Sequence, residues 1–385
     1  MGLHAAVGYA QALDGREASL QATHLALNRL GTQSPSMGFV IASHLYQARD
    51  VANGLSGLLG DIPIIGFSAP AGLTNDGLHP HSVAVGILSS DDLEARPHWI
   101  SGYAQSSREA ARQLIELLQE HHAEKALFFS DGFNGDAEQF CETLAGEKYQ
   151  IVGGLSSGDL HTGNTYQIAG MQTGTGAMAA LTVKGKLHIG TGGAHGWDPV
   201  GTLMQVTRSR GFWLRTLNSK PASETYAELF GFPAREWGFP PLSHMARLYP
   251  LGIEHGEELT IRAPIRVEAD GSFRMNAPVH DGTDAFVLVG SRSNCQKAAE
   301  QAAQQALRGM NGIKPVFALV LVDVAWQMLL KASPGIEVSA VQSILGEDIP
   351  ILGGYTLGQV TQMKADRQLQ FLNQHIVVIV FGEKE

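Results

Sequence analysis

The sequence predicts a mixed α/β fold in which layered sheets are joined by crossover helices, and three observations predict it. A short apolar strand, a helix and a second apolar strand follow one another three times along the chain. A third apolar strand closes each copy. Each helix ends at a glycine followed by an acidic residue, in the pairs Gly60-Asp61, Gly146-Glu147 and Gly346-Glu347. This recurrence predicts three related β-α-β-β units spread over two domains.

The three copies place their strands in the same order. The first strands cover 39–42, 126–129 and 317–322, and the second strands cover 62–68, 150–156 and 349–356. Strand–helix–strand order predicts a parallel pair joined by a right-handed crossover. The closing strands, 83–88, 177–183 and 376–381, are expected to return antiparallel at an edge.

Capping residues in the sequence also predict where helices begin. Ser106 and Glu109 form a capping box before an apolar stripe, and Asp136 with Gln139 marks the helix of the second copy. A further helix is expected over 293–308. The region from about 187 to 290 follows a different pattern, with many prolines. We therefore expect an N-terminal domain over 1–210, with two copies, and a C-terminal domain over 211–385, with an irregular β portion and the third copy.

Glycine is the compositional outlier, at 45 of 385 residues, where an average protein has about 7%. The glycines follow no collagen period and lie singly or in pairs among Ile, Val and Leu. This distribution indicates positional use, at turns or beside a ligand.

Charge and cysteine content exclude several classes of protein. The formal net charge is −10, and no basic run occurs, so neither nucleic acid nor an anionic membrane is an expected partner. Cys141 and Cys295 are too few for a disulfide framework, and reducing cytosol is the natural compartment. The first residues lack the pattern of a signal peptide, and no apolar run reaches about 18 residues. These features predict a cytoplasmic protein.

The second strand of each copy ends in glycine and hydroxyl residues. In open α/β sheets, ligands collect beyond the carboxyl ends of parallel strands. Glycine lets backbone N–H groups approach a ligand, and hydroxyls donate or accept hydrogen bonds. The alternative is that these glycines only permit tight turns and close packing. The expected ligand-binding residues at the strand ends are Gly66, Phe67, Ser68, Ala69, Gly153, Gly154, Ser156, Ser157, Gly354, Tyr355 and Thr356.

Other motifs carry weaker signals. The segment 154–158 matches G-x-S-x-G around Ser156, but a turn-rich loop follows where a nucleophile elbow needs a helix. His79 and His81 have metal-ligand spacing without an identifiable third ligand. Nucleotide-binding glycine motifs are missing from the sequence. We therefore expect no catalytic residue and no metal site.

These segments, in this order, resemble FIST-domain sensory proteins over about residues 35–382. The N-terminal half carries Ile-Pro-Ile-Ile-Gly-Phe-Ser at 62–68 and Val-Gly-Gly-Leu-Ser-Ser-Gly-Asp at 152–159. The C-terminal half carries Tyr-Pro-Leu-Gly-Ile at 249–253, Arg-Ala-Pro-Ile at 262–265 and Gly-Gly-Tyr-Thr-Leu-Gly at 353–358. Arg262 and Gln359, which lie in or next to these segments, complete the expected ligand-binding set.

The resemblance implies a prokaryotic module that binds small molecules such as amino acids. Signalling would then need a separate partner, such as a histidine kinase or a cyclic-di-nucleotide enzyme. No cofactor is expected under this hypothesis. Two departures adjoin the expected pocket, because 321–325 lacks the expected Cys and Arg, and Gln359 replaces a usual acidic residue. Two alternatives stay open: a haem-binding nitric-oxide sensor with an axial histidine, and a hydrolase using Ser156.

Overall fold

The computed structural model describes residues 2–239, 241–255, 258–362 and 368–384. The chain forms two compact units. Unit 1 comprises Met1–His195, Gln296–Phe371 and His375–Glu385, and unit 2 comprises Gly196–Cys295 and Leu372–Gln374. The boundaries between the units, at 195/196 and 295/296, differ from the predicted division at residue 210. The third copy belongs to the same unit as the first two copies. The longer segment of unit 2, Gly196–Cys295, lies between the second and third copies in the sequence and corresponds to the region of different pattern near 187–290.

Unit 1 consists of three repeats, each longer than the sequence analysis predicted. Repeat 1 runs through β1 (His4–Ala10), α1 (Gly15–Leu30), β2 (Met37–Ser43), α2 (Ala48–Leu59), β3 (Ile64–Ala69), β4 (Ala71–Thr74), β5 (Gly77–Pro80) and β6 (Val83–Ser89). Repeat 2 runs through β7 (Leu93–Ile100), α3 (Ser107–Glu120), β8 (Lys125–Ser130), α4 (Ala137–Thr143), β9 (Gln150–Leu155), β10 (Gln167–Ala169), β11 (Gln172–Gly174) and β12 (Met178–Gly185). Repeat 3 begins with β13 (Leu187–His195) and continues, after unit 2, through α7 (Arg292–Gly309), β22 (Phe317–Asp323), α8 (Val324–Leu329), α9 (Ile336–Leu345), β23 (Ile351–Thr356), β24 (Gln359–Gln362), β25 (Leu369–Leu372) and β26 (His375–Glu383).

The repeats build three six-stranded sheets with one topology. The strand orders are β1-β6-β2-β3-β10-β11 in the first sheet, β7-β12-β8-β9-β24-β25 in the second and β13-β26-β22-β23-β4-β5 in the third. The predicted parallel pairs are confirmed as β2/β3, β8/β9 and β22/β23. The predicted antiparallel return strands are confirmed as β6, β12 and β26. These sheets and their crossover helices confirm the mixed α/β class.

The repeats exchange their hairpins in a cycle. The β4–β5 hairpin of repeat 1 extends the third sheet, and the β10–β11 hairpin of repeat 2 extends the first sheet. Strands β24 and β25 of repeat 3 extend the second sheet next to β9. Each sheet is therefore extended by a segment of another repeat, so that β3, β9 and β23 have a neighbour on both sides.

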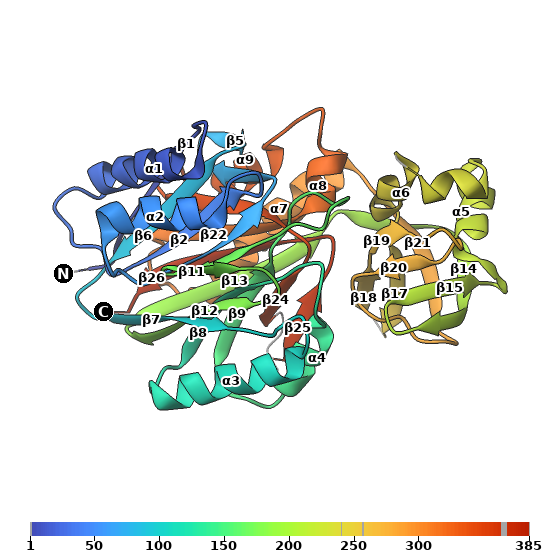
Figure 1. The fold of residues 1–385 in the computed structure, drawn as a ribbon, viewed down its shortest axis with the longest axis horizontal. Coiled ribbons are helices and arrows are strands. Elements are labelled where there is room, and N and C mark those ends of the chain that lie inside the picture. Colours follow the sequence, from blue (N-terminus) through green and yellow to red (C-terminus); the bar gives the residue numbers. More distant parts are fainter. Residues whose placement is uncertain (1, 240, 256–257, 363–367, 385) are drawn as a thin grey trace. The chain divides into compact units, whose positions relative to one another are not determined.

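Helices of unit 1 begin at the predicted caps. Ser106 Oγ accepts a hydrogen bond from Glu109 N at 3.2 Å, and an Asp136 carboxylate oxygen accepts one from Gln139 N at 3.0 Å. Both bonds satisfy N–H groups that have no partner within the helix. At the other end, α2 and α9 stop at Gly60 and Gly346, whose φ angles are +58° and +98°. In Figure 1, α1 and α2 lie over the first sheet and α3 lies over the second sheet.

Glycines allow neighbouring backbones to approach closely at equivalent positions of the repeats. A Cβ atom on Gly66 would overlap the Val40 carbonyl oxygen on the parallel neighbour strand, and one on Gly153 would overlap the Phe128 carbonyl oxygen. In repeat 3, a Cβ atom on Gly353 would lie 2.6 Å from the carbonyl oxygen of Val320. Since real Cβ atoms do not reach such distances, this position requires glycine in all three parallel pairs.

Unit 2 is a small mixed domain around one eight-stranded sheet of order β18-β17-β21-β14-β15-β20-β19, with β16 paired to β15. Its strands are β14 (Trp197–Arg210), β15 (Trp213–Leu217), β16 (Lys220–Pro221), β17 (Leu251–His255), β18 (Glu258–Arg262), β19 (Pro264–Val267), β20 (Phe273–Met275) and β21 (Asp284–Gly290). Its helices are α5 (Ala222–Phe230), α6 (Leu242–Met245) and the 3-10 turns η1 (Ala234–Gly238) and η2 (Ala246–Leu248). The core gathers Tyr226, Trp237 and Phe273, whose rings meet edge to face.

Candidate functional site

The carboxyl ends of β3, β9 and β23, one from each repeat, meet and are hydrogen-bonded to one another. Ser157 N donates to Ser68 O at 2.9 Å, and Ser68 Oγ donates to Ser157 O at 2.9 Å. Ser157 Oγ donates to Tyr355 O at 2.5 Å, and Leu357 N donates to Leu155 O at 2.9 Å. The structure thus brings together the three segments that the sequence analysis singled out. We call this group of residues, 66–69, 153–157 and 354–359, the strand-end cluster.

Most hydroxyls of the strand-end cluster are already bonded to the protein. Ser156 Oγ donates to Ser130 O at 2.9 Å and accepts from Gln167 Nε2 at 2.7 Å. Thr356 Oγ1 donates to Val322 O at 3.2 Å and accepts from Gln359 Nε2 at 2.7 Å. These bonds hold each strand end against its neighbours. The amide oxygen of Gln359 does not take part in them.

Gln359 Oε1 has no hydrogen-bond partner among the described residues, although its side chain is fully buried. A buried acceptor without a donor costs about 1–3 kcal/mol, so a donor from a ligand or water would stabilise it. The side chain is held in place by its bond to Thr356. It therefore presents a fixed acceptor within the strand-end cluster.

A buried carboxyl group lies beside Tyr355. The Tyr355 hydroxyl donates a short hydrogen bond to Glu337 Oε1 on α9, and Glu337 Oε2 has no partner among the described residues. Burial raises the pKa of Glu337, opposed by the Tyr355 hydrogen bond, and burial with the nearby Glu337 raises the pKa of Tyr355. This pair is a second place near the cluster where an acceptor oxygen is unmatched.

The remaining predicted residues of unit 1 are buried and have packing contacts. The residues that directly follow Gly66 and Gly353 in the sequence, Phe67 and Gly354, contact other repeats. The Phe67 ring lies 4.5 Å from the ring of Phe129, and a Cβ atom on Gly354 would lie 2.6 Å from Ile41 Cγ2. A Cβ on Gly154 would lie 3.0 Å from Leu321 Cδ1. The interior between the repeats therefore uses one phenylalanine and two glycines at equivalent positions. Ala69 is buried as well.

Arg262 belongs to unit 2, at the end of β18. Its side chain is 8% exposed, and its Nη1 donates to Ile261 O at 2.9 Å. The strand-end cluster and Arg262 are thus placed in different compact units.

The weaker motifs have local partners. The segment after Ser156 is not helical, as a nucleophile elbow would require. His79 stacks on Tyr9 with ring centres 3.6 Å apart, and His81 lies against Tyr46 at 4.7 Å. Within the described residues, no three His, Cys, Asp or Glu side chains gather as metal ligands would.

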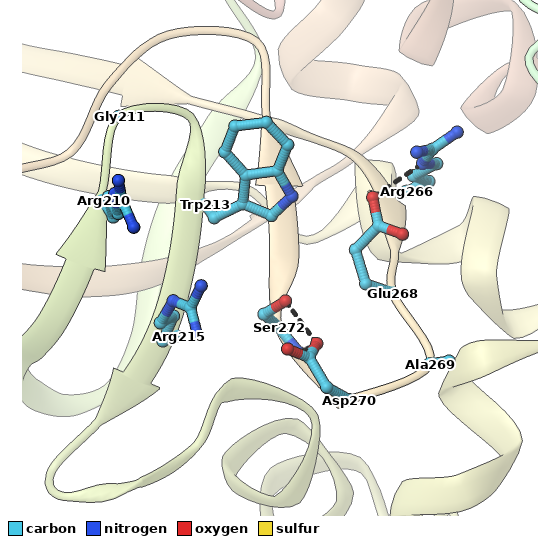
Figure 2. A pocket seen from close by; sticks show the side chains of 9 residues that line it. All are labelled: Arg210, Gly211, Trp213, Arg215, Arg266, Glu268, Ala269, Asp270 and Ser272. Atoms are coloured by element: carbon cyan, nitrogen blue, oxygen red, sulfur yellow. Dashed lines mark hydrogen bonds and ion pairs between the residues drawn. The ribbon is translucent and has the colours of Figure 1, made fainter.

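A hollow of about 820 Å³, which was not predicted from the sequence, lies on unit 2 (Figure 2). Arg210 and Arg215 line one side, and Arg266 with Glu268 lines the other. Trp213 lies between them with 39% of its surface exposed. The signal in the sequence is a set of arginines around one tryptophan in an acidic chain. It could not be recognised as a site without the strand pairing that brings 210–215 and 266–272 together.

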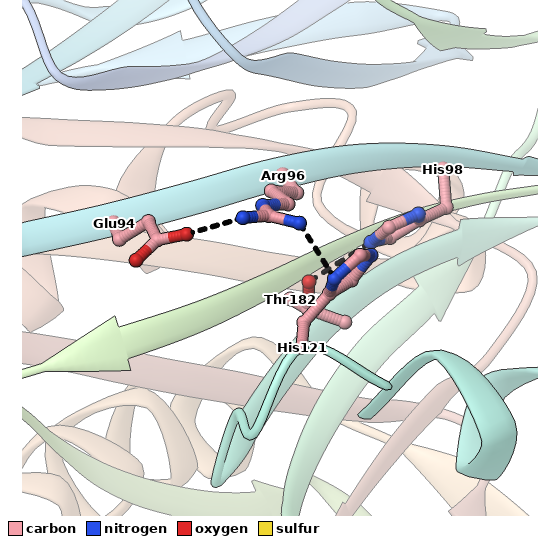
Figure 3. Close-up of polar contacts among 5 residues, drawn as sticks. All are labelled: Glu94, Arg96, His98, His121 and Thr182. Atoms are coloured by element: carbon pink, nitrogen blue, oxygen red, sulfur yellow. Dashed lines mark hydrogen bonds and ion pairs between the residues drawn. The ribbon is translucent and has the colours of Figure 1, made fainter. Parts of the chain in front are cut away.

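A polar row crosses the second sheet at β7 (Figure 3). Arg96 contacts both Glu94, at 2.7 Å, and His121 Nδ1, at 2.8 Å. The His121 ring stacks on His98 with centres 5.1 Å apart, and His98 Nε2 contacts Thr182 Oγ1 at 2.9 Å. Burial, then His121 and Arg96, lower the pKa of His98 to about 4. His121 is the residue at which α3 ends, and its contacts with Arg96 and His98 are contacts within the protein.

The fold and the strand-end cluster define an α/β protein of three concatenated repeats with an inserted β-rich unit. Models of the FIST N domain and the FIST C domain match residues 36–220 and 222–362. The chain therefore belongs to the FIST family, whose domains serve as sensory domains in signal transduction. No curated protein matches the chain significantly.

Solved structures show distant likenesses. A structure described as "Cyanuric acid hydrolase: evolutionary innovation by structural concatenation" is 8% identical, covers 100% of both chains and has a TM-score of 0.38. A cyanuric acid hydrolase from A. caulinodans is 11% identical over 47% of this chain and 71% of its own, with a TM-score of 0.25. T. maritima PurL complexed with FGAR is 10% identical over 99% and 73%, with a TM-score of 0.26. Structural similarity at this level gives no information about the substrate, ligand or reaction of this chain. Separately, no described helix is long and apolar enough to cross a membrane.

Proposed function

We propose that this chain is a cytoplasmic, prokaryotic sensory module that binds a small ligand and regulates a separate signalling protein. Membership of the FIST family over most of the chain supports the sensory role. The ligand class we propose is an amino acid or another small metabolite with N–H donors. The protein acts without catalysing a reaction, and its partner is a histidine kinase or a cyclic-di-nucleotide enzyme.

The observation that carries the ligand-binding part is the unmatched oxygen of Gln359. It lies fully buried in the strand-end cluster, where segments from three repeats join. An ammonium or amide group of a ligand supplies the donor that Gln359 Oε1 lacks, and a hydrogen bond to a charged donor is worth about 1.5–3 kcal/mol. Glu337 Oε2 offers a second acceptor beside Tyr355.

A ligand at this cluster would contact residues of all three repeats at once. Ser157 is bonded to Ser68 of repeat 1 and to Tyr355 of repeat 3. A ligand signals only if it binds one conformation of the protein more tightly than another. Rearrangement of these bonds between repeats is the change we propose for a partner to recognise.

Thermal shift assays followed by isothermal titration, with the twenty amino acids and small metabolites bearing N–H groups, test the proposal. We expect at least one compound to raise the melting temperature and to bind with saturation. Gln359→Leu should weaken its binding by about tenfold or more. The melting temperature of the ligand-free protein should change little, because the substitution removes the unmatched buried acceptor together with the hydrogen bond to Thr356. Gln172→Leu, at an exposed position of β11, is the matched control.

The site assignment fails if a bound compound keeps its affinity in Gln359→Leu. The sensory proposal itself fails if no compound in the panel binds. Saturable uptake of haemin with a Soret shift would favour the haem-sensor alternative instead.

A further inference from the structure

The hollow on unit 2 carries positive charge that its own acidic residues do not neutralise. Arg266 Nε is paired with Glu268 Oε1 at 2.8 Å. Asp270 accepts hydrogen bonds from the backbone and hydroxyl of Ser272, at 3.0 and 2.5 Å. These bonds, with a smaller contribution from Arg215, lower the pKa of Asp270. Both carboxylates of the hollow are therefore satisfied within the protein.

The two arginines of the opposite wall, Arg210 and Arg215, differ from Arg266 in their pairing. No ion pair joins Arg210 or Arg215 to another residue in the described ranges. Arg210 is exposed and Arg215 is half-buried, and both line the hollow. In a chain with a formal net charge of −10, two guanidiniums left together in a concave site indicate a place for an anion.

The strand pairing places an aromatic ring among these charges. Arg210 on β14 is the direct cross-strand partner of Trp213 on β15, and Trp213 is the partner of Arg274 on β20. Arg274 is in turn the partner of Arg266 on β19. Directly opposite residues lie on one face of a sheet, so the four side chains form one row. The Arg274 guanidinium carbon lies 5.9 Å from the centre of the indole ring.

We propose that this hollow binds a small molecule in which a flat ring carries an acid group, either carboxylate or phosphate. The guanidinium is planar and pairs with either oxyanion through two parallel hydrogen bonds. The part-exposed indole of Trp213 offers a surface on which the ring stacks. A volume of about 820 Å³ lies within the range of small-molecule sites. The site stands apart from the proposed function, because none of its residues belongs to the strand-end cluster.

Isothermal titration of the full chain with AMP and with isophthalate tests the proposal and separates phosphate from carboxylate. Adenosine and inorganic phosphate are the matched probes that carry only the ring or only the charge. We expect AMP or isophthalate to bind with saturation, and adenosine and phosphate to bind at least about tenfold more weakly. Binding should also quench tryptophan fluorescence, and Trp213→Phe should remove that quenching.

Single variants locate the site. Arg210→Gln and Arg215→Gln should each weaken the binding by about tenfold. Arg208→Gln, on the same strand but outside the hollow, should change it less than about twofold. Thermal melting of each variant shows that it is folded, and Gln359→Leu should leave this binding unchanged.

Three results would overturn the proposal. The first is that neither AMP nor isophthalate binds the folded protein at millimolar concentration. The second is that inorganic phosphate binds as tightly as AMP and isophthalate do. The third is that Arg208→Gln weakens binding as much as Arg210→Gln and Arg215→Gln.

Discussion

His98 is a residue that the fold keeps neutral at physiological pH. Its ring is part-buried between Thr182 and the stacked ring of His121, and the guanidinium of Arg96 lies nearby. Arginine has only donors, so His121 Nδ1 accepts the hydrogen bond from Arg96. Protonation of His98 would place a positive charge near the Arg96 guanidinium and the His121 ring. This repulsion adds to the free-energy cost of burying a charged His98 ring.

The lowered pKa of His98 predicts a loss of stability in mild acid. Its pKa is about 4 in the folded protein, whereas an unperturbed histidine has a pKa of 6.5. Between these values the unfolded chain binds the proton and the folded chain does not, so the free energy of unfolding falls as pH falls from 6.5 towards 4. Because the ring is partly exposed, we expect this loss to be about 1–2 kcal/mol.

Urea unfolding of wild type and His98→Gln above pH 7 and near pH 5 measures this effect. The variant keeps a hydrogen-bonding group for Thr182 and should lose less stability than wild type on acidification. His24→Gln, at an exposed position of α1, controls for the removal of a histidine. Equal losses in wild type and His98→Gln would show that His98 does not cause the acid sensitivity.

Several single residues could be read correctly from the sequence because their roles are local. Ser106 and Asp136 cap helices through bonds that span three residues. The role of Gly66 was open between ligand binding and close packing, and the structure shows the Val40 carbonyl where its Cβ would be. That contact joins two strands and could not be derived from local sequence. Trp213 was missed for the same reason, since its neighbours depend on strand pairing.

At the scale of elements, α2 contains two glycines with opposite environments. Gly54 is buried, and a Cβ there would overlap Ser19 Oγ and lie 2.5 Å from Arg16 O of α1. Gly57 is exposed, and its nearest neighbour would be Leu20 Cδ2 at an ordinary 3.6 Å. The first glycine lets α1 and α2 pack closely, whereas the second has no such function.

Alanine substitutions in α2 separate these roles. Gly57→Ala should raise the free energy of unfolding by about 0.5–1 kcal/mol, because alanine favours the helix. Gly54→Ala should lower it by about 1–3 kcal/mol, because the added methyl group forces α1 and α2 apart. Chemical denaturation of the two variants measures both values. A similar gain from both substitutions would contradict the close packing of α1 on α2.

The elements themselves were predicted where the apolar pattern was long. The parallel pairs, the return strands and the helices α3 and α7 follow the sequence prediction. Strand β1 and helix α1 were missed, as were the short hairpins β4–β5 and β10–β11. Each strand of these hairpins has only three or four residues, and each hairpin pairs with a sheet of another repeat through one strand, β4 or β10. No local sequence signal indicates such a partner.

At the scale of the whole molecule, the cyclic exchange of hairpins makes the three repeats of unit 1 depend on one another. Each sheet is completed by a segment from a different repeat, and the strand-end cluster lies where the three repeats are bonded together. A ligand that changes one repeat end therefore acts on the contacts of all three. This connection is the reason for which we propose the strand-end cluster as the ligand site.

Native mass spectrometry of the full chain, incubated with the pooled amino acids and small metabolites, tests the ligand-binding function most directly. We predict a complex that carries one small molecule per chain, dissociates on denaturation and is lost in Gln359→Leu but kept in Gln172→Leu. A spectrum that shows only the unbound chain in native conditions, or only a haem adduct after addition of haemin, would contradict the account.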